Sequence, residues 1–102
     1  MRQHIELLKA RFAACAARGE VTHRREEARF TLALLHEPRR ALSLAKANWA
    51  VQREPADARI VMEAAQGSAE PTACRPVLAW MKNNRIEDVH LALLAKAMDL
   101  QP

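Results

Sequence analysis

The stretch Glu37–Ile60, EPRRALSLAKANWAVQREPADARI, decides the fold of this chain. Pro38 fits the first turn of a helix, because the N–H that proline lacks has no partner in that turn. Pro55 ends this helix, since the residue before a proline avoids helical backbone angles. The stretch therefore predicts one helix from Pro38 to about Gln52 and the start of another at about Ala56.

The rest of the chain also predicts helices. Ala, Leu, Arg and Glu dominate the 102 residues, Gly occurs twice, and no window alternates apolar and polar residues as a strand would. Turn signals, among them Gly19, Gly67-Ser68 and Asn83-Asn84, divide it further, with Thr22 as an expected helix N-cap. The remaining helices are expected over residues 2–18, 22–35, 56–66, 70–83 and 86–100.

One of these helices carries two prolines, Pro71 and Pro76, which cannot both lie in its first turn. An interior proline removes a backbone hydrogen bond and clashes with the preceding turn. Either this helix begins near Thr72, or Pro76 bends it.

Alternate helices begin alike, with an acid, a small residue, a basic residue and two large apolar residues, at spacings of 30 and 31. The three copies are Glu27-Ala28-Arg29-Phe30-x-Leu32, Asp57-Ala58-Arg59-Ile60-x-Met62 and Asp88-Val89-His90-Leu91-x-Leu93. Trp49 and Trp80 lie 31 residues apart in the intervening helices. A helix-pair period in the low thirties is typical of an α-solenoid.

The prediction is thus an all-α single domain over residues 1–102, with about six helices stacked as antiparallel hairpins in a short right-handed α-solenoid. Helix pairs are expected at 22–54 and 55–85, flanked by single helices at 1–19 and 86–100. Because a large side chain that recurs at one repeat position usually fills one structural hole, Trp49 and Trp80 are predicted core residues.

The run His36-Glu37-Pro38-Arg39-Arg40-Ala41-Leu42, followed by Ala45, Trp49 and Pro55, resembles the turn and second helix of a divergent tetratricopeptide repeat of the bacterial type. The resemblance covers roughly residues 22–100, although Arg29 stands where that family has Gly. It implies a scaffold or adaptor that binds a protein or peptide segment on a surface made mostly by the first helix of each pair.

Four basic residues are candidates for that surface. Arg29, Arg59 and His90 hold one register position in three helices, and Arg25 lies one turn before Arg29. Such a row suits an acidic segment, because Arg binds a carboxylate through two hydrogen bonds. The alternative is that Arg29 pairs with Glu26 and Arg59 with Glu63 on a solvated surface.

The net charge of +4 is uneven, since residues 1–55 hold 11 Lys or Arg against 6 Asp or Glu. Nucleic acid is therefore the alternative partner for the basic N-terminal half. It is disfavoured because the chain has no Tyr and few aromatic residues for base stacking. No apolar segment approaches the ~20 residues that span a bilayer, so no membrane association is expected.

No group of residues in the sequence has the composition and spacing of a catalytic or metal-binding site. The four His residues are scattered, and Cys15 and Cys74 stand far apart without a paired motif, so neither a metal site nor a disulfide framework is expected. The prediction is a protein that is not an enzyme, needs no cofactor and resides in the cytoplasm, where buried thiols such as Cys15 act as apolar filler.

The two end helices carry broad apolar faces. The last one offers Leu91, Leu93, Leu94, Ala95 and Met98, and the first offers Ile5, Leu8, Phe12 and Cys15. Because solenoids normally end in helices with a polar outer face, we expect a homodimer or a missing neighbouring repeat.

Overall fold

The computed structural model describes residues 2–17 and 24–100, with the backbone alone for residues 15–17. Within these ranges the chain is helical and contains no strand, so the all-α prediction is confirmed. The elements are α1 (Arg2–Ala17), α2 (Arg24–Ala33), α3 (Pro38–Trp49), α4 (Pro55–Gly67), the 3-10 helix η1 (Pro71–Cys74), α5 (Arg75–Asn83) and α6 (Val89–Ala97). The caps expected at Gly19 and Thr22 and the side chain of Cys15 lie outside the described residues.

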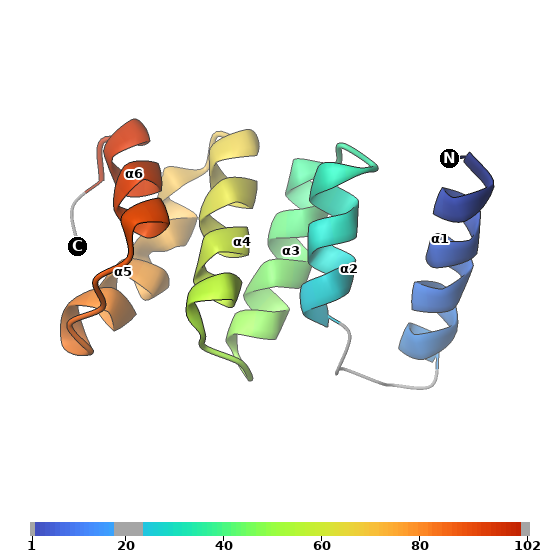
Figure 1. The fold of residues 1–102 in the computed structure, drawn as a ribbon, viewed down its shortest axis with the longest axis horizontal. Helices are drawn as coiled ribbons and strands as arrows, with labels where there is room; N and C mark the ends of the chain where they lie inside the picture. The colour runs from blue at the N-terminus through green and yellow to red at the C-terminus, as the bar shows by residue number, and fades with distance from the viewer. Residues whose placement is uncertain (1, 18–23, 101–102) are drawn as a thin grey trace.

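Helices α2, α4 and α6 run side by side in one direction, and α3 and α5 lie behind them in the opposite direction (Figure 1). Close packing joins α2 to α3, α3 to α4, and α4 to η1 and α6. The result is an elongated molecule of 40 × 24 × 20 Å. Helix α1 stands at one end and α6 at the other.

Pro38 and Pro55 occupy the first turns of α3 and α4, as the sequence predicts. The region with two prolines differs from both expectations. Pro71 starts η1 and Pro76 lies in the first turn of a separate helix, α5, so neither proline interrupts a helix. Because the segment forms two short helices, each proline lies in a first turn, where its missing N–H and its ring disturb no helical hydrogen bond.

Three helices end on a non-glycine residue with left-handed backbone, Ala69 (φ 56°), Arg85 (φ 52°) and Asp99 (φ 57°). In each case the next residue donates its N–H to the carbonyl five residues back, as in a Schellman motif. The N···O distances are 2.9 Å from Glu70 to Ala65, 2.9 Å from Ile86 to Met81 and 2.8 Å from Leu100 to Ala95. The stop expected at Gly67-Ser68 is found within one residue, since α4 ends at Gly67 and Ser68 is its C-cap.

The expected helix over 86–100 is shorter in the structure. Asp88 is its N-cap and accepts a hydrogen bond from the Leu91 N–H at 3.0 Å, so α6 starts at Val89. The helix predicted to reach Gln52 likewise ends at Trp49.

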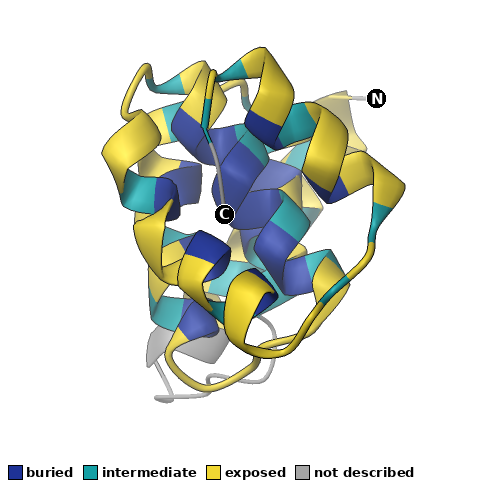
Figure 2. Ribbon diagram, turned by 90° about the vertical axis from the view of Figure 1, so that its left-hand side faces the viewer, coloured by how far each residue is buried: buried dark blue, intermediate teal, exposed yellow. Residues whose placement is uncertain are grey.

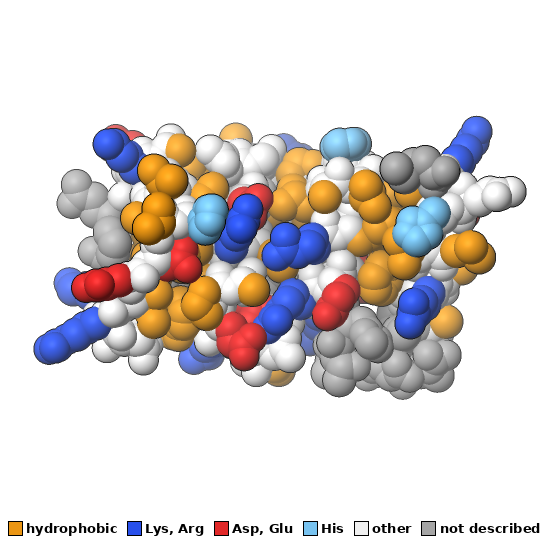
Figure 3. All heavy atoms as spheres, viewed as in Figure 1, with side chains coloured by type: hydrophobic (Ala, Val, Ile, Leu, Met, Phe, Trp, Pro, Cys, Tyr) orange, Lys and Arg blue, Asp and Glu red, His pale blue; other side chains and the backbone are white. Residues whose placement is uncertain are grey.

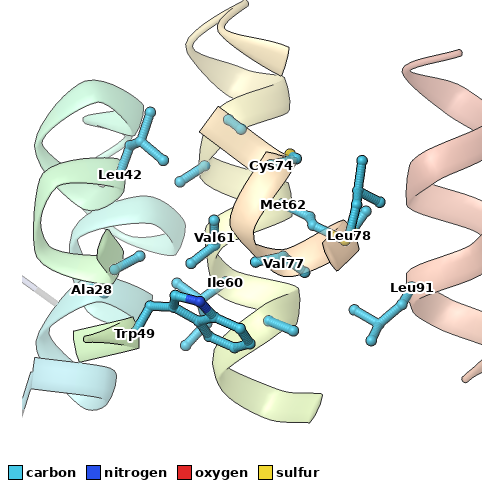
Figure 4. Packing of buried hydrophobic residues seen from close by; sticks show 14 of the residues in the cluster. Ala28, Leu42, Trp49, Ile60, Val61, Met62, Cys74, Val77, Leu78 and Leu91 are labelled. Carbon is cyan, nitrogen blue, oxygen red and sulfur yellow. The ribbon is translucent and has the colours of Figure 1, made fainter. Parts of the chain in front are cut away.

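Helix α4 lies at the centre of the core, with Ile60, Val61 and Met62 almost fully buried (Figure 4). Many of the surrounding positions are alanine, which lets the helices approach closely: Ala28, Ala41, Ala45, Ala58, Ala64 and Ala65 are all buried. Seen from the α6 end, the buried residues gather in the middle of the bundle and the exposed residues lie on its outside (Figure 2).

Candidate protein-binding surface

The face formed by α2, α4 and α6 carries three of the four predicted basic residues. Arg59 and His90 line one shallow hollow of about 220 Å³, together with Glu63, Leu93 and Leu94. His90 is exposed and Arg59 partly exposed. Figure 3 shows a His side chain over α6 and Lys or Arg side chains over α4 and toward α2 on this face. The structure therefore brings Arg59 and His90 together at one site.

Arg59 is already paired within its own helix. Its Nε lies 2.9 Å from Glu63 Oε1, and both side chains remain partly exposed. Pairs at this spacing on a helix surface stabilise it by about 0.3–0.5 kcal/mol. The sequence-level alternative of an Arg59–Glu63 pair is thus observed, but so weak a pair leaves the guanidinium available to another carboxylate.

Arg29 is exposed on α2, and no ion pair of Arg29 with Glu26 is found within the described part of the chain. It holds the same position in the recurring sequence pattern as Arg59, 30 residues earlier, and α2 packs against α4. Arg29 is therefore open to solvent on the same layer of helices.

Arg25 does not belong to this row. Its Nε lies 2.6 Å from Asp57 Oδ1, and its Nη2 lies 2.9 Å from Asp57 Oδ2 and 2.5 Å from Glu54 Oε2. The hydrogen bonds that Arg25 donates to Asp57 raise the pKa of its guanidinium above the ordinary value, and the one to Glu54 adds to the effect. Arg25 was expected to extend the binding row, but the structure commits its guanidinium to these carboxylates.

Asp57 is almost fully buried and joins three helices. Besides Arg25 from α2, it accepts hydrogen bonds from Asn48 Nδ2 of α3 at 2.6 Å and from the Glu54 N–H at 3.1 Å. We call Arg25, Asn48, Glu54 and Asp57 the Asp57 cluster. The Asn48 Oδ1 is buried without a partner in the described structure. Sequence reasoning missed this cluster, although an acid two residues after Pro55 is a signal for a helix start.

The two tryptophans contact each other. Their ring centroids are 5.1 Å apart and their planes are perpendicular. Trp49 is 8% exposed, whereas Trp80 is only partly buried. The two residues form one edge-to-face pair between α3 and α5, which differs from the expectation of two equivalent buried sites.

Cys74 is the free thiol of the described structure. Cys74 is fully buried, and burial raises the pKa of its thiol to about 11, so it stays protonated and poorly nucleophilic at neutral pH. Among the described residues, no three His, Cys, Asp or Glu side chains are grouped as a metal site requires. In the same ranges, no helix has both the length and the apolar character to cross a membrane.

Comparisons with family models, with curated proteins and with solved structures found no match to this chain.

Proposed function

We propose that this chain is a protein-binding scaffold, a short tetratricopeptide-like array that holds a peptide or protein segment across α2, α4 and α6. The observation that supports it is the hollow where Arg59 and His90 meet exposed Leu93 and partly buried Leu94. Basic groups beside apolar side chains suit an extended segment that carries both carboxylates and apolar residues.

Arg29 lengthens this surface by one helix. Because Arg29 and Arg59 hold the same register on neighbouring helices, a segment that crosses α2, α4 and α6 meets Arg29, Arg59 and the imidazole of His90 in turn. Its carboxylate replaces Glu63 as the partner of Arg59 at small cost, since that pair is partly exposed. The proposed activity is binding without a chemical step or cofactor, in the cytoplasm, where a free thiol such as Cys74 persists.

The test is binding of a labelled acidic peptide with interspersed leucines, followed by fluorescence anisotropy. The double variant Arg29→Ala and Arg59→Ala should weaken binding about tenfold, since two charge-assisted contacts are worth roughly 1.4 kcal/mol together. Arg39→Ala is the matched control, because Arg39 is exposed on α3 in the other layer. An equal loss in the control, or no loss in the double variant, would contradict the proposal.

Nucleic acid is the alternative partner, but the described structure has no exposed aromatic side chain on which a base could stack. None of the four aromatic side chains, all of which lie in the described ranges, is exposed: Phe12 packs on Phe30, and Trp49 on Trp80. Stacking on aromatic rings is the sequence-tolerant part of single-strand binding. Tighter binding of a labelled oligonucleotide than of the acidic peptide, with steep salt dependence, would overturn the proposal in favour of nucleic acid.

A further inference from the structure

A stripe of three positions recurs on α2, α4 and α6, but it is covered on only two of them. Helices α2 and α4 each pack against elements that follow them in the chain. The members of the stripe on these helices are buried or half-buried: Ala28, Thr31 and Leu32 on α2, and Ala58, Val61 and Met62 on α4. Ala58 and Met62 are 0% exposed.

The equivalent stripe on α6 faces solvent. Val89 is 74% exposed, Leu93 is 60% exposed, and Ala92 between them is exposed as well. By contrast, Leu91 and Ala95, which match Ile60 and Ala64 of α4, are buried as those residues are. Helix α6 thus packs on the preceding helices normally and presents the surface that a following helix would cover.

This end of the molecule also has a hollow of about 720 Å³ beside the exposed stripe. Apolar residues that include Met81, Ile86, Val89 and Ala92 line it. Its charged residues are mainly acidic, since Glu87, Asp88 and Asp99 stand against the single cation Lys96. Figure 2 looks onto this end, where the outer surface of the helices is exposed. The hollow suits a basic helix with an apolar stripe.

Helix α1, at the opposite end, is basic and exposes one large apolar residue, Leu7. Its contact with α2 centres on Phe12, whose ring lies 5.5 Å from that of Phe30, and α1 is not among the closely packed helix pairs. Leu7 is 70% exposed, and Arg11 and Ala14 share its face at helical spacing. Arg2, Lys9 and Arg11 outnumber Glu6, so α1 is basic where the α6 end is acidic.

The directions of the helices agree with this pairing. In Figure 1, α1, α3 and α5 descend while α2, α4 and α6 rise. A second copy placed beyond α6 in the same orientation sets its descending α1 beside the rising α6. The antiparallel order of neighbouring helices then continues from one copy into the next. In that antiparallel pair, the Arg2 end of α1 lies near Asp99, and the Arg11 end lies near Glu87.

We propose that α1 of a second copy packs on the exposed face of α6, so that copies of this chain associate head to tail. The outward side of α1 covers Val89, Ala92 and Leu93 and leaves the Phe12–Phe30 contact intact. Such a contact uses two different surfaces, so it adds further copies in an open row.

The test is sedimentation velocity over a wide concentration range at low salt. The wild-type chain should form species larger than a dimer as its concentration rises, and added salt should weaken them. Leu7→Glu and Ala92→Glu each place a charge in one half of the contact, and each variant alone should remain a monomer. Both residues are exposed, so the variants should fold, which circular dichroism checks.

An equimolar mixture of the two variants decides the geometry. The Leu7→Glu variant keeps an intact α6 face, and the Ala92→Glu variant keeps an intact α1. One copy of each can therefore pair through these two surfaces, and the mixture should form a dimer and nothing larger. Val51→Glu is the matched control, because Val51 is 62% exposed and lies outside both surfaces. A wild-type chain that stays monomeric overturns the proposal, as does self-association of Leu7→Glu alone, which would indicate pairing of α6 with α6.

Discussion

At the scale of single residues, Asp57 links more elements than any other polar side chain of the described structure. Its carboxylate accepts from Arg25 on α2 and Asn48 on α3 while it belongs to the first turn of α4. A buried carboxylate is tolerated only when it is paired and hydrogen-bonded. Arg25 therefore has a structural role, and its loss affects folding more than binding.

We predict that Arg25→Ala lowers the free energy of unfolding by about 3–5 kcal/mol, because Asp57 stays buried without its cation. Urea denaturation at neutral pH measures this. Arg29→Ala is the control, since Arg29 is exposed, and it should change stability by less than about 0.5 kcal/mol. Equal effects of the two substitutions would show that the Asp57 cluster contributes no more than a surface charge.

Cys74 predicts a pH dependence of stability. Burial raises the pKa of its thiol from 9.0 to about 11, so the folded state holds the proton more tightly than the unfolded state. The stabilisation is complete below pH 9 and is lost as the pH rises toward 11, by about 2–3 kcal/mol. Denaturation of the wild-type chain and of Cys74→Ala across this range should show the steeper decline in the wild type. If the stability of both proteins declined equally with pH, ionisation of Cys74 would not be the cause.

At the scale of elements, the end of α4 shows how tertiary contacts decide which residue terminates a helix. A Cβ on Gly67 would lie 3.0 Å from the Pro38 Cβ, so a larger residue there would crowd the first turn of α3. Left-handed backbone falls instead on Ala69, at a strain of roughly 1–2 kcal/mol.

Two substitutions at this helix end should therefore act against simple helix propensity. Gly67→Ala normally favours a helix, but here it should destabilise by about 1–3 kcal/mol because of the contact with Pro38. Ala69→Gly should stabilise by about 0.5–1 kcal/mol, as strain relief exceeds the added freedom of the unfolded chain. Thermal unfolding compares both with wild type. A higher melting temperature for Gly67→Ala would refute the steric argument.

The sequence predicts what local chemistry controls. Pro38 and Pro55 fix the starts of α3 and α4 because a proline constrains its own turn. The Arg59–Glu63 pair was also foreseeable, since residues four apart on a helix are neighbours. Arg25 and Asp57 are 32 residues apart, however, and only the packing of α2 on α4 brings them together. The same holds for the approach of Gly67 to Pro38, which no local pattern encodes.

At the scale of the whole molecule, the two ends differ in how firmly they are attached. Helix α6 packs on α4, with Leu91 and Ala95 buried. Helix α1 has no fully buried residue among those whose side chains are described, and Ile5, Leu8 and Phe12 are only half-buried. A hollow of about 580 Å³ lies between α1 and α2, beside the contact of Phe12 with Phe30, and both rings line it.

We therefore predict that amide hydrogens of α1 exchange through local opening, with much lower protection than those of α3 and α4. Opening α1 breaks mainly the Phe12–Phe30 contact, whereas exposing α4 requires global unfolding. Hydrogen exchange by NMR on the Ala92→Glu variant measures this without self-association. In the wild-type chain, protection of α1 should rise with concentration while that of α4 stays constant, because a second copy then covers α1. Equal protection of α1 and α4 in the variant would show that α1 folds as part of the cooperative core.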